Sequence, residues 1–584
     1  MSEVRGSTAH GDVSGSDYSG AAVTDLNTKN ESESSGSSTD VSFNEQTNYV
    51  PRRRIVMIFL TCASVDMVAL IDQTTLAVAL SIIGSALHAG RQASWIANAY
   101  FLTSTSFQLI YGRLSDIWSR KLVLLSGLFI FFFGSLAASL AQTAPQLIAF
   151  RAITGVGGGG LMTVAQIIVS DVVSLRERGK YQGILGAVVA LSNGVGPVIG
   201  GALVSQSEES WRWIFRLNLP LTLITTACVF FFMPLRPVEG SWKKKLKAVD
   251  FIGAALTLAC SALLVLGFTW AGADYAWDSA HVLGTLIGGV ATGVLFILHQ
   301  WKLSPLPLMP LYIFRQKVVV GAVLTMFVNG WNFVVQVYYI PSFYQLAFGY
   351  SPIKAGTLLL PLVLVQTASS TLSGLMVTWT GRYKELILFG WVLWAVGLGL
   401  FSTINENTSL GKQVGYSMLT GFGIGHTLQP SLVAIQAGVA RADMAVVTST
   451  RNFVRNLGGT LGLAIAGTLL NNHLVDALQP LGLSSSEIVV IIDSPLSRLD
   501  GTPHDDRLRM AVLDGYRHGF RIIFILGAAL AALATLLAFW LLPNIPLDRN
   551  DDEEQKTIAK LRIEEEKMRR KEKEGDGSTG TSAV

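Results

Sequence analysis

Long runs of apolar residues, separated by short polar connectors, recur along the chain from about residue 50 to about residue 545. As a helix, each run is long enough to cross a hydrocarbon core of ~30 Å. The pattern predicts an all-α polytopic membrane protein with about fourteen transmembrane helices. Their predicted ranges are 55–83, 94–112, 122–141, 146–170, 183–204, 217–234, 250–271, 281–299, 318–340, 355–378, 386–404, 413–439, 444–470 and 519–542.

Basic residues are unevenly distributed between the connectors. Alternate connectors are rich in arginine and lysine, and the positive-inside rule places these in the cytoplasm. Both termini are then cytoplasmic, and we expect the plasma membrane, with the vacuolar membrane as the alternative. The basic connectors hold Arg113, Arg120, Lys121, Arg176, Arg178, Lys180, Arg236, Lys243, Lys244, Lys245, Lys247, Lys302, Arg315, Lys317, Arg382, Lys384 and Arg441, and the others hold Arg91, Arg212, Arg216 and Lys412.

Composition agrees with a membrane location. Half of the residues are hydrophobic and only 14% are charged, against roughly a quarter in soluble domains. The net charge of +4 gives no support for a nucleic-acid partner. The sequence contains no phosphate-binding loop, metal-ligand spacing or nucleophile elbow, so we expect neither an enzyme nor a cofactor.

The chain divides into parts by composition. The N-terminal segment is rich in Ser, Gly, Asp and Thr and has too few apolar side chains to fold alone. The predicted parts are a disordered cytoplasmic tail at 1–50, a six-helix bundle at 51–235, two inserted helices with linkers at 236–317, a second six-helix bundle at 318–545 with a long extracellular loop at 471–518, and a charged cytoplasmic tail at 546–584.

Three short patterns recur in the same order in both halves, at offsets of about 262 to 266 residues. Matched order and offset predict two parallel repeats with two extra helices between them. The matched sets are Gly112, Asp116, Ser119 and Arg120 with Gly374, Thr378, Gly381 and Arg382; Thr154, Gly155 and Gly157 with Thr420, Gly421 and Gly423; and Gly196, Gly200 and Gly201 with Gly462, Ala466 and Gly467.

A stripe of small residues marks the fifth predicted helix. Ser192, Gly196 and Gly200 lie at i, i+4 spacing, so a neighbouring helix can approach them closely. Pro197 lacks a backbone N–H and is followed by Gly201, which predicts a kink. An ordinary small-xxx-small helix contact is the alternative interpretation.

Several motifs together resemble those of the major facilitator superfamily and, within it, the fourteen-span drug:proton antiporter group. The resemblance covers about residues 50 to 545 and implies two six-helix bundles that rock around a central cavity. A serine stands at position 119, where the superfamily usually has glycine. The similar segments are LIDQTTLAVAL at 70–80, GRLSDIWSRK at 112–121, RAITGVGGGG at 151–160, LSNGVGPVIGG at 191–201 and WRWIFRLNLP at 211–220.

Charged residues inside apolar runs are the candidates for proton coupling. A carboxyl in hydrocarbon is costly when ionised, so it persists when it has a partner, water or a function. Asp72 is the first candidate, and Asp66 is a weaker one on another face of the same helix. Arg151 must also find a partner, and the nearest plausible one is an acid of the first helix. The alternatives are a purely structural carboxylate, and an arginine that extends to the membrane surface.

A second cluster of charges is predicted at the cytoplasmic side. Gly112, Asp116, Arg120 and Lys121 lie between the second and third helices, and we expect Asp171 to lie close to them. Ion pairs between the halves, or Asp116 against the N-terminus of the helix near Met444, are expected to hold this side shut. The alternative is that these charges only set the topology.

Polar and aromatic residues within the helices are the candidates for substrate contacts. Such groups suit a cavity for aromatic or cationic organic molecules, although interhelical hydrogen bonds and an aromatic belt explain them equally well. The candidates are Asn329, Trp331, Asn332, Gln336, Tyr338, Tyr339, Gln366 and Gln429.

We therefore expect a monomeric proton antiporter, driven by the proton gradient, that exports small organic molecules across the lipid bilayer. The serine-rich tail and the long last loop resemble fungal members, for which export of toxins, drugs or secondary metabolites is implied. Two alternatives stay open. One is proton-coupled uptake, for example of siderophore-iron chelates, and the other is a receptor or scaffold that transports nothing.

Overall fold

The computed structural model describes residues 52–547 with several gaps. The gaps are 88, 90–92, 174, 205–208, 234–240, 272–274, 351, 406, 485–486, 489–490 and 492–505. Side chains are also outside the description at 52–54, 77–78, 81–82, 85, 93–94, 175–176, 178–180, 182–184, 187, 190, 197, 242, 352–353 and 506. The predicted tails at 1–50 and 546–584 therefore lie outside the described residues, apart from 546 and 547, as do the side chains of Arg176, Arg178 and Lys180.

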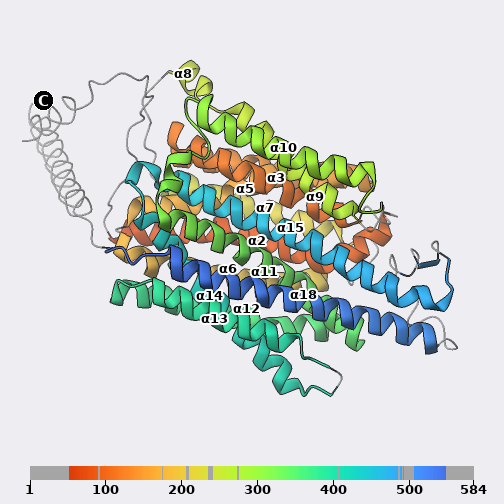
Figure 1. The fold of residues 1–584 in the computed structure, drawn as a ribbon. Coiled ribbons are helices and arrows are strands. Elements are labelled where there is room, and N and C mark those ends of the chain that lie inside the picture. Colours follow the sequence, from red (N-terminus) through yellow and green to blue (C-terminus); the bar gives the residue numbers. More distant parts are fainter. Residues whose placement is uncertain are drawn as a thin grey trace, which may run out of the picture. The chain divides into compact units, whose positions relative to one another are not determined.

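Fourteen long helices account for most of the described chain (Figure 1). Each of them overlaps one predicted range, so the helical pattern is confirmed. The first six are α2 (Arg52–Ala86), α3 (Ala93–Ile117), α4 (Arg120–Ser139), α5 (Ala144–Val172), α6 (Leu175–Val204) and α7 (Arg212–Phe232). Short α8 (Trp242–Lys247) then precedes α9 (Phe251–Trp270) and α10 (Ala280–Lys302). The last six are α11 (Lys317–Phe348), α12 (Pro352–Thr380), α13 (Lys384–Phe401), α14 (Leu410–Ala437), α15 (Met444–Leu478) and α18 (Asp506–Leu541).

The first six and last six helices pack in the same pattern. In the first set, α3 and α4 pack on α5, α2 packs on α6, and α2 and α4 pack on α7. In the second set, α12 and α13 pack on α14, α11 packs on α15, and α11 and α13 pack on α18. Every contact thus has its counterpart in the same chain order. This agreement is what two parallel six-helix bundles require.

The bundles meet along two matched contacts, α3 with α15 and α6 with α12. The inserted pair α9 and α10 breaks this symmetry, because α9 packs against both α3 and α15. Thr468 of α15 donates a hydrogen bond of 2.8 Å to the carbonyl oxygen of Phe268 in α9. The inserted helices therefore cover one of the two contacts between the bundles.

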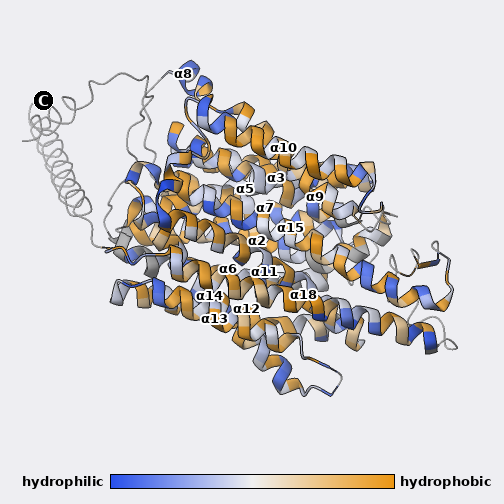
Figure 2. Ribbon diagram, viewed as in Figure 1, coloured by the Kyte–Doolittle hydropathy of each residue, from blue (hydrophilic) through white to orange (hydrophobic). Residues whose placement is uncertain are grey.

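Hydrophobic residues predominate along the long helices (Figure 2). Eleven of the described helices are long and apolar enough to cross a membrane, and α9 and α10 are the least buried of them. Trp540 of α18 and Phe231 of α7 are 77% and 75% exposed, which suits a hydrocarbon solvent and not water. Hydrophilic residues gather toward helix ends and at α8 (Figure 2).

The segment predicted as a long loop at 471–518 is partly helical. Helix α15 continues to Leu478, and α18 begins at Asp506. Polar Asn471 and Asn472 end the apolar run, yet Leu474 and Leu478 remain fully buried. A Cβ on Gly515 of α18 would touch the Cα of Leu474 at 3.2 Å. Close packing against α18 thus extends the helix beyond its hydrophobic window.

Candidate functional site

Asp72 and Arg151 form a buried ion pair between helices α2 and α5. The Arg151 guanidinium donates from one terminal nitrogen to both carboxylate oxygens of Asp72, at 3.1 and 2.8 Å. Both side chains are essentially inaccessible, at 0% and 1% exposure. Helix α5 begins after Thr143, whose hydroxyl caps the Gln146 N–H, so Arg151 lies two turns inside. The structure therefore places the arginine on a first-helix acid and not at the membrane surface.

Groups from two further helices surround the pair. Asn218 of α7 donates a hydrogen bond of 2.6 Å to Oδ1 of Asp72. The Arg151 guanidinium lies over the Tyr100 ring of α3, 4.5 Å from its centroid, and 5.7 Å from the centroid of Phe215. Aromatic ring faces attract a cation, the more strongly where it is buried. The pair is thus held by four helices of the first bundle.

The site borders the second bundle. Tyr338 of α11 is close enough to interact electrostatically with both Asp72 and Arg151. Its ring meets Phe101 of α3 edge to face, with centroids 6.2 Å apart. A movement of one bundle against the other would therefore change the surroundings of the ion pair.

Asp66, the weaker candidate, is on the same helix but in a different setting. It is 2% exposed, and its Oδ1 accepts no hydrogen bond from the described residues. No ion pair joins it to a described cation, in contrast to Asp72. Its role stays a prediction.

The small-residue stripe of α6 packs against α2 beside Asp72. A Cβ on Gly196 would lie 1.9 Å from the Thr74 hydroxyl, and one on Gly200 would lie 2.8 Å from the carbonyl oxygen of Thr75. The close contact that the spacing predicts is therefore present. Gly201 is half-buried, and the Pro197 side chain lies outside the described residues. Helix α6 spans this segment without interruption.

The predicted cytoplasmic cluster joins four helices of the first bundle. Arg120 at the start of α4 binds Asp116 of α3 at 2.7 Å and Asp171 of α5 at 2.9 Å. Arg113 lies 3.8 Å from Asp116, and Lys121 donates to the Phe230 carbonyl oxygen of α7 at 2.6 Å. These contacts fix the ends of α3, α4, α5 and α7 as one unit.

The turn in this cluster does not need a glycine. Ser119 has φ −67° and ψ 143°, an ordinary extended conformation. Its hydroxyl accepts a hydrogen bond from the Leu122 N–H and so caps α4. The serine that departs from the superfamily's usual glycine is thus a helix cap.

Direct contacts between the bundles lie beside this cluster. A Cβ on Gly112 of α3 would lie 2.3 Å from the Ser449 hydroxyl oxygen of α15. Nearby, Asn452 of α15 donates to Gln166 of α5 at 2.9 Å, and Gln436 of α14 donates to Ser170 of α5 at 2.8 Å. The bundles therefore touch at the end that the sequence predicts to be cytoplasmic.

Several candidate substrate-contacting residues form hydrogen bonds with neighbouring helices of their own bundle. Asn332 donates to the Gly527 carbonyl oxygen of α18 at 3.0 Å, and Gln336 accepts from the Trp394 indole of α13 at 2.7 Å. Tyr339 donates at 3.4 Å to Leu463 of α15. In this conformation these three side chains connect helices. Their contact with substrate stays a prediction.

The other candidate residues differ from one another in their surroundings. Asn329 of α11 donates to the Thr427 hydroxyl of α14 at 3.0 Å. Trp331 packs on Gly462 of α15, where a Cβ would lie 3.0 Å from the indole ring. Gln366 is buried, and its side-chain oxygen accepts no hydrogen bond from described residues. Gln429 faces the first bundle, since a Cβ on Gly186 would lie 3.6 Å from its amide nitrogen.

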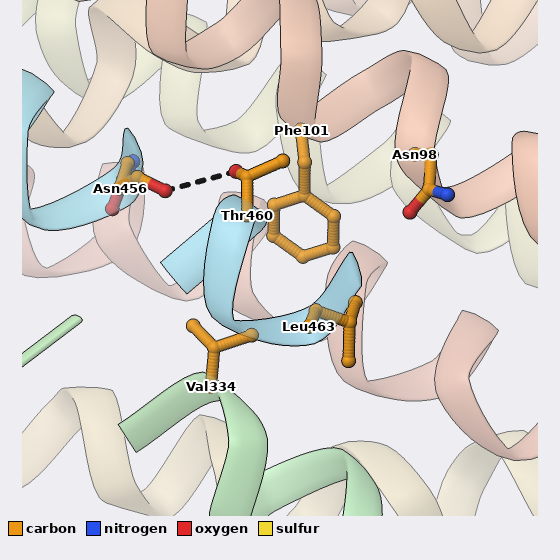
Figure 3. A pocket seen from close by; sticks show the side chains of 6 residues that line it. All are labelled: Asn98, Phe101, Val334, Asn456, Thr460 and Leu463. Atoms are coloured by element: carbon orange, nitrogen blue, oxygen red, sulfur yellow. Dashed lines mark hydrogen bonds between the residues drawn. The ribbon is translucent and has the colours of Figure 1, made fainter. Parts of the chain in front are cut away.

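A small cavity lies where α3, α11 and α15 meet (Figure 3). The cavity has a volume of about 20 Å³, which is enough for roughly one water molecule. The lining residues are Asn98, Phe101, Val334, Asn456, Thr460 and Leu463. Side chains of both bundles line this cavity. In this conformation it is too small for an organic substrate.

Sequence reasoning missed several polar residues of the site. Asn218 lies within the segment 211–220 that resembles the superfamily, but as an uncharged residue in an apolar run it was not singled out. Arg451 and Arg455 of α15 were detectable, because the rule that singled out Arg151 applies equally to them. Arg451 is only 2% exposed.

Comparison with known proteins assigns the family. The model of the Major Facilitator Superfamily matches residues 62–463. The chain belongs to the Major Facilitator Superfamily. It is therefore a transporter in class and not an enzyme, as the sequence predicted.

Fungal members of the superfamily are similar over most of the chain. Citrate exporter 1 of Yarrowia lipolytica is 35% identical over 491 residues, which are 84% of this chain and 72% of that protein. Efflux pump dotC of Dothistroma septosporum is 33% identical over 467 residues, 79% of this chain and 80% of that protein. The human organic anion transporter MFSD10, a crystal structure, gives a TM-score of 0.54 at 16% identity and covers 84% of this chain and 100% of that one. This last similarity concerns the superfamily fold alone.

Proposed function

We propose that this protein is a proton-coupled exporter of small organic molecules. The names of the two fungal relatives, an exporter and an efflux pump, support the direction of transport. The observation that carries the coupling is the Asp72–Arg151 pair, a buried carboxylate whose surroundings include both bundles. The transporter is a monomer in the plasma membrane, with both termini in the cytoplasm.

The proton is held at the Asp72 carboxylate. With Arg151 and Asn218 in contact, the carboxylate is stabilised in its ionised form. When the bundles rock, a change in these contacts lets Asp72 take a proton from the outer side and later release it inside. The buried Asp72 carboxylate then has one set of partners in each of the two conformations, and this difference distinguishes the two states of the transport cycle.

The contacts beside Gly112 act as the cytoplasmic gate. Arg120 ties α3, α4 and α5 together, so that the end of the first bundle moves as one body. The described contacts to the second bundle include hydrogen bonds between neutral groups, such as that between Asn452 and Gln166. Each costs little to break, at about 0.5–1.5 kcal/mol, so the gate can open during a cycle.

Reconstitution in liposomes tests the proposal. Purified protein is placed in vesicles with an acidic or an alkaline interior, and accumulation of radiolabelled citrate and of ethidium is followed, with protein-free vesicles as the control. An acidic interior should drive uphill accumulation of at least one probe, and nigericin should abolish it. Accumulation that is the same with the gradient reversed or collapsed would refute proton coupling.

A further inference from the structure

Two arginines lie one helical turn apart in the interior of the second bundle. Arg451 and Arg455 are at i, i+4 spacing on α15, so both face the same side of the helix. Neither forms an ion pair with any described residue. In the first bundle, by contrast, the buried Arg151 is neutralised by Asp72.

The sequence of the second bundle offers little to neutralise them. Helices α11, α12 and α14 contain no Asp or Glu, while α13 and α15 carry one each, Glu385 and Asp476, near their ends. Both of these carboxylates are exposed. In α18, Asp506 and Asp514 lie in the N-terminal part of the helix. The centre of this bundle thus carries two positive charges without a protein carboxylate, which is costly in a low-dielectric interior.

The two arginines differ in how their donors are used. Arg451 donates to the Leu428 carbonyl oxygen at 2.7 Å, to the Ser431 hydroxyl at 3.1 Å and to the Asn452 side chain at 3.0 Å. It therefore links α15 to α14 and has a structural role. Its charge nevertheless remains uncompensated.

Arg455 is held in place through its Nε, while its terminal nitrogens stay available for a ligand. Its Nε donates to the Asn329 side-chain oxygen at 2.8 Å, and its guanidinium lies 5.1 Å from the centroid of the Phe333 ring. Its terminal nitrogens donate no hydrogen bond to any described residue, and the side chain is only partly buried. A guanidinium oriented by one side, with its terminal donors unused, is arranged to bind a carboxylate in a bidentate manner.

The residue that follows Arg455 lines the space between the bundles. The adjoining Asn456, and Thr460 one turn later, line the cavity together with Phe101 and Asn98 of the first bundle (Figure 3). When the bundles separate on one side, this cavity is the space that widens. A ligand entering it meets polar groups of α15, the first of which directly follows Arg455 in the chain.

We propose that Arg455 is the carboxylate-binding residue of the transport site, and that the cargo is a small organic anion with two or more carboxylates. Arg451, one turn away, adds a second positive charge that favours a polycarboxylate over a monocarboxylate. The bound anion supplies the negative charge that the second bundle lacks. That this anion is exported rests on the proposed function, whereas its binding does not.

Binding is tested without any gradient. The thermal unfolding of the purified full-length protein in detergent is measured with citrate, succinate, acetate and tetraphenylphosphonium, with sodium chloride at matched ionic strength as the control. Citrate and succinate should raise the unfolding temperature in a saturable manner, citrate at the lower concentration. A protein stabilised by tetraphenylphosphonium and by neither polycarboxylate would overturn the inference.

Variants then locate the site. Arg455→Gln should weaken citrate binding at least tenfold, and Arg455→Lys, which keeps the charge but not the planar fork, should weaken it less. Asn329→Asp places a carboxylate against Arg455 with almost no change in shape and should also weaken binding at least tenfold. Arg521→Gln removes an exposed positive charge of α18 and should bind as the wild type does. Unfolding without ligand identifies any variant that fails to fold, and undiminished citrate binding by both folded Arg455→Gln and folded Asn329→Asp would refute the site.

The two proposals fail separately. Citrate binding without gradient-driven movement leaves Arg455 as an anion site and removes proton-coupled export. Gradient-driven transport of ethidium, with no polycarboxylate binding, leaves the exporter and removes the anion site.

Discussion

Asn218 and Arg151 donate to the same oxygen of Asp72, Oδ1, from two different helices. The Asn218 contact is the shorter, at 2.6 Å against 3.1 Å. Because α7 supplies this second donor, the carboxylate does not depend on the arginine alone. The two donors make the ion pair a junction of α2, α5 and α7.

Replacing Asn218 with leucine keeps the volume similar and removes one donor to a buried carboxylate. We expect a loss of about 1.5–3 kcal/mol of stability, since a hydrogen bond to a charged group is lost. Thermal unfolding of the purified protein measures the loss. Thr225→Val, in the same helix, removes only a hydrogen bond of 3.5 Å and should change stability by far less. Equal unfolding temperatures for the two variants would show that the Asn218 contact contributes nothing.

Asp72→Asn should abolish accumulation driven by a pH gradient, because the amide cannot carry the proton. It also leaves Arg151 buried without an anion, at a cost of about 3–5 kcal/mol. The double variant Asp72→Asn with Arg151→Gln removes both charges and should recover part of this stability but not the coupling. Unfolding temperature and accumulation in acid-interior vesicles are the two measurements. Unchanged accumulation by the single variant would exclude Asp72 as the coupling acid.

Gly200→Ala should disturb the contact between α6 and α2, because its Cβ would lie 2.8 Å from the carbonyl oxygen and 2.9 Å from the Cα of Thr75. Backbone atoms cannot move aside as a side chain can, so we expect a loss of about 1–3 kcal/mol and slower transport. Gly194→Ala is the matched control in the same helix. Its nearest atom, on Leu360, would be 4.0 Å away, and it should be neutral or slightly stabilising. The idea fails if both variants behave alike.

The helices were predictable, since length and hydrophobicity are local properties of the sequence. The pairing of Arg151 with Asp72 was also within reach, because a charge in an apolar run demands a partner. The end of α15 was not, since Leu474 and Leu478 are buried by α18, a helix distant in sequence. The positions of Asn332 and Gln336 depend on how α11 is rotated toward α18 and α13, which sequence periodicity left open. Arg455 was overlooked, and only the contacts distinguish it from the structural Arg451.

Gly112→Ala tests whether the predicted gate depends on close packing between the bundles. The new Cβ would lie 2.3 Å from the hydroxyl oxygen and 2.5 Å from the Cβ of Ser449. We expect at least a tenfold loss of transport, because α3 and α15 cannot close fully on this side. Ser449→Gly removes the obstructing atoms, so the double variant should transport much faster than Gly112→Ala. Absence of rescue would mean that Gly112 acts through another contact.

Asp250 caps α9, and we expect its carboxylate to stabilise the junction of the inserted helices α9 and α10 in a pH-dependent manner. Asp250 accepts hydrogen bonds from the Gly253 N–H at 2.8 Å and from Gln300 at 2.7 Å, and its Oδ1 lies 2.8 Å from His299 Nε2. Burial alone would raise the pKa of Asp250, but these hydrogen bonds outweigh it and lower the pKa below its ordinary value. A carboxyl with a lowered folded pKa stabilises the fold fully above its unfolded pKa, and this contribution is lost as the pH falls through the folded pKa.

Asp250→Asn should therefore unfold at a lower temperature than the wild type at pH 7, by an amount that corresponds to about 1.5–3 kcal/mol. The difference should narrow below about pH 4, where the wild-type carboxylate also takes up a proton. Thermal unfolding of both proteins across this range provides the measurement. Asp278→Asn removes another carboxylate from the connector between the same two helices, at an exposed position, and serves as the control. Equal unfolding temperatures at pH 7, or a difference that persists undiminished below about pH 4, would show that the Asp250 carboxylate does not stabilise the junction of α9 and α10.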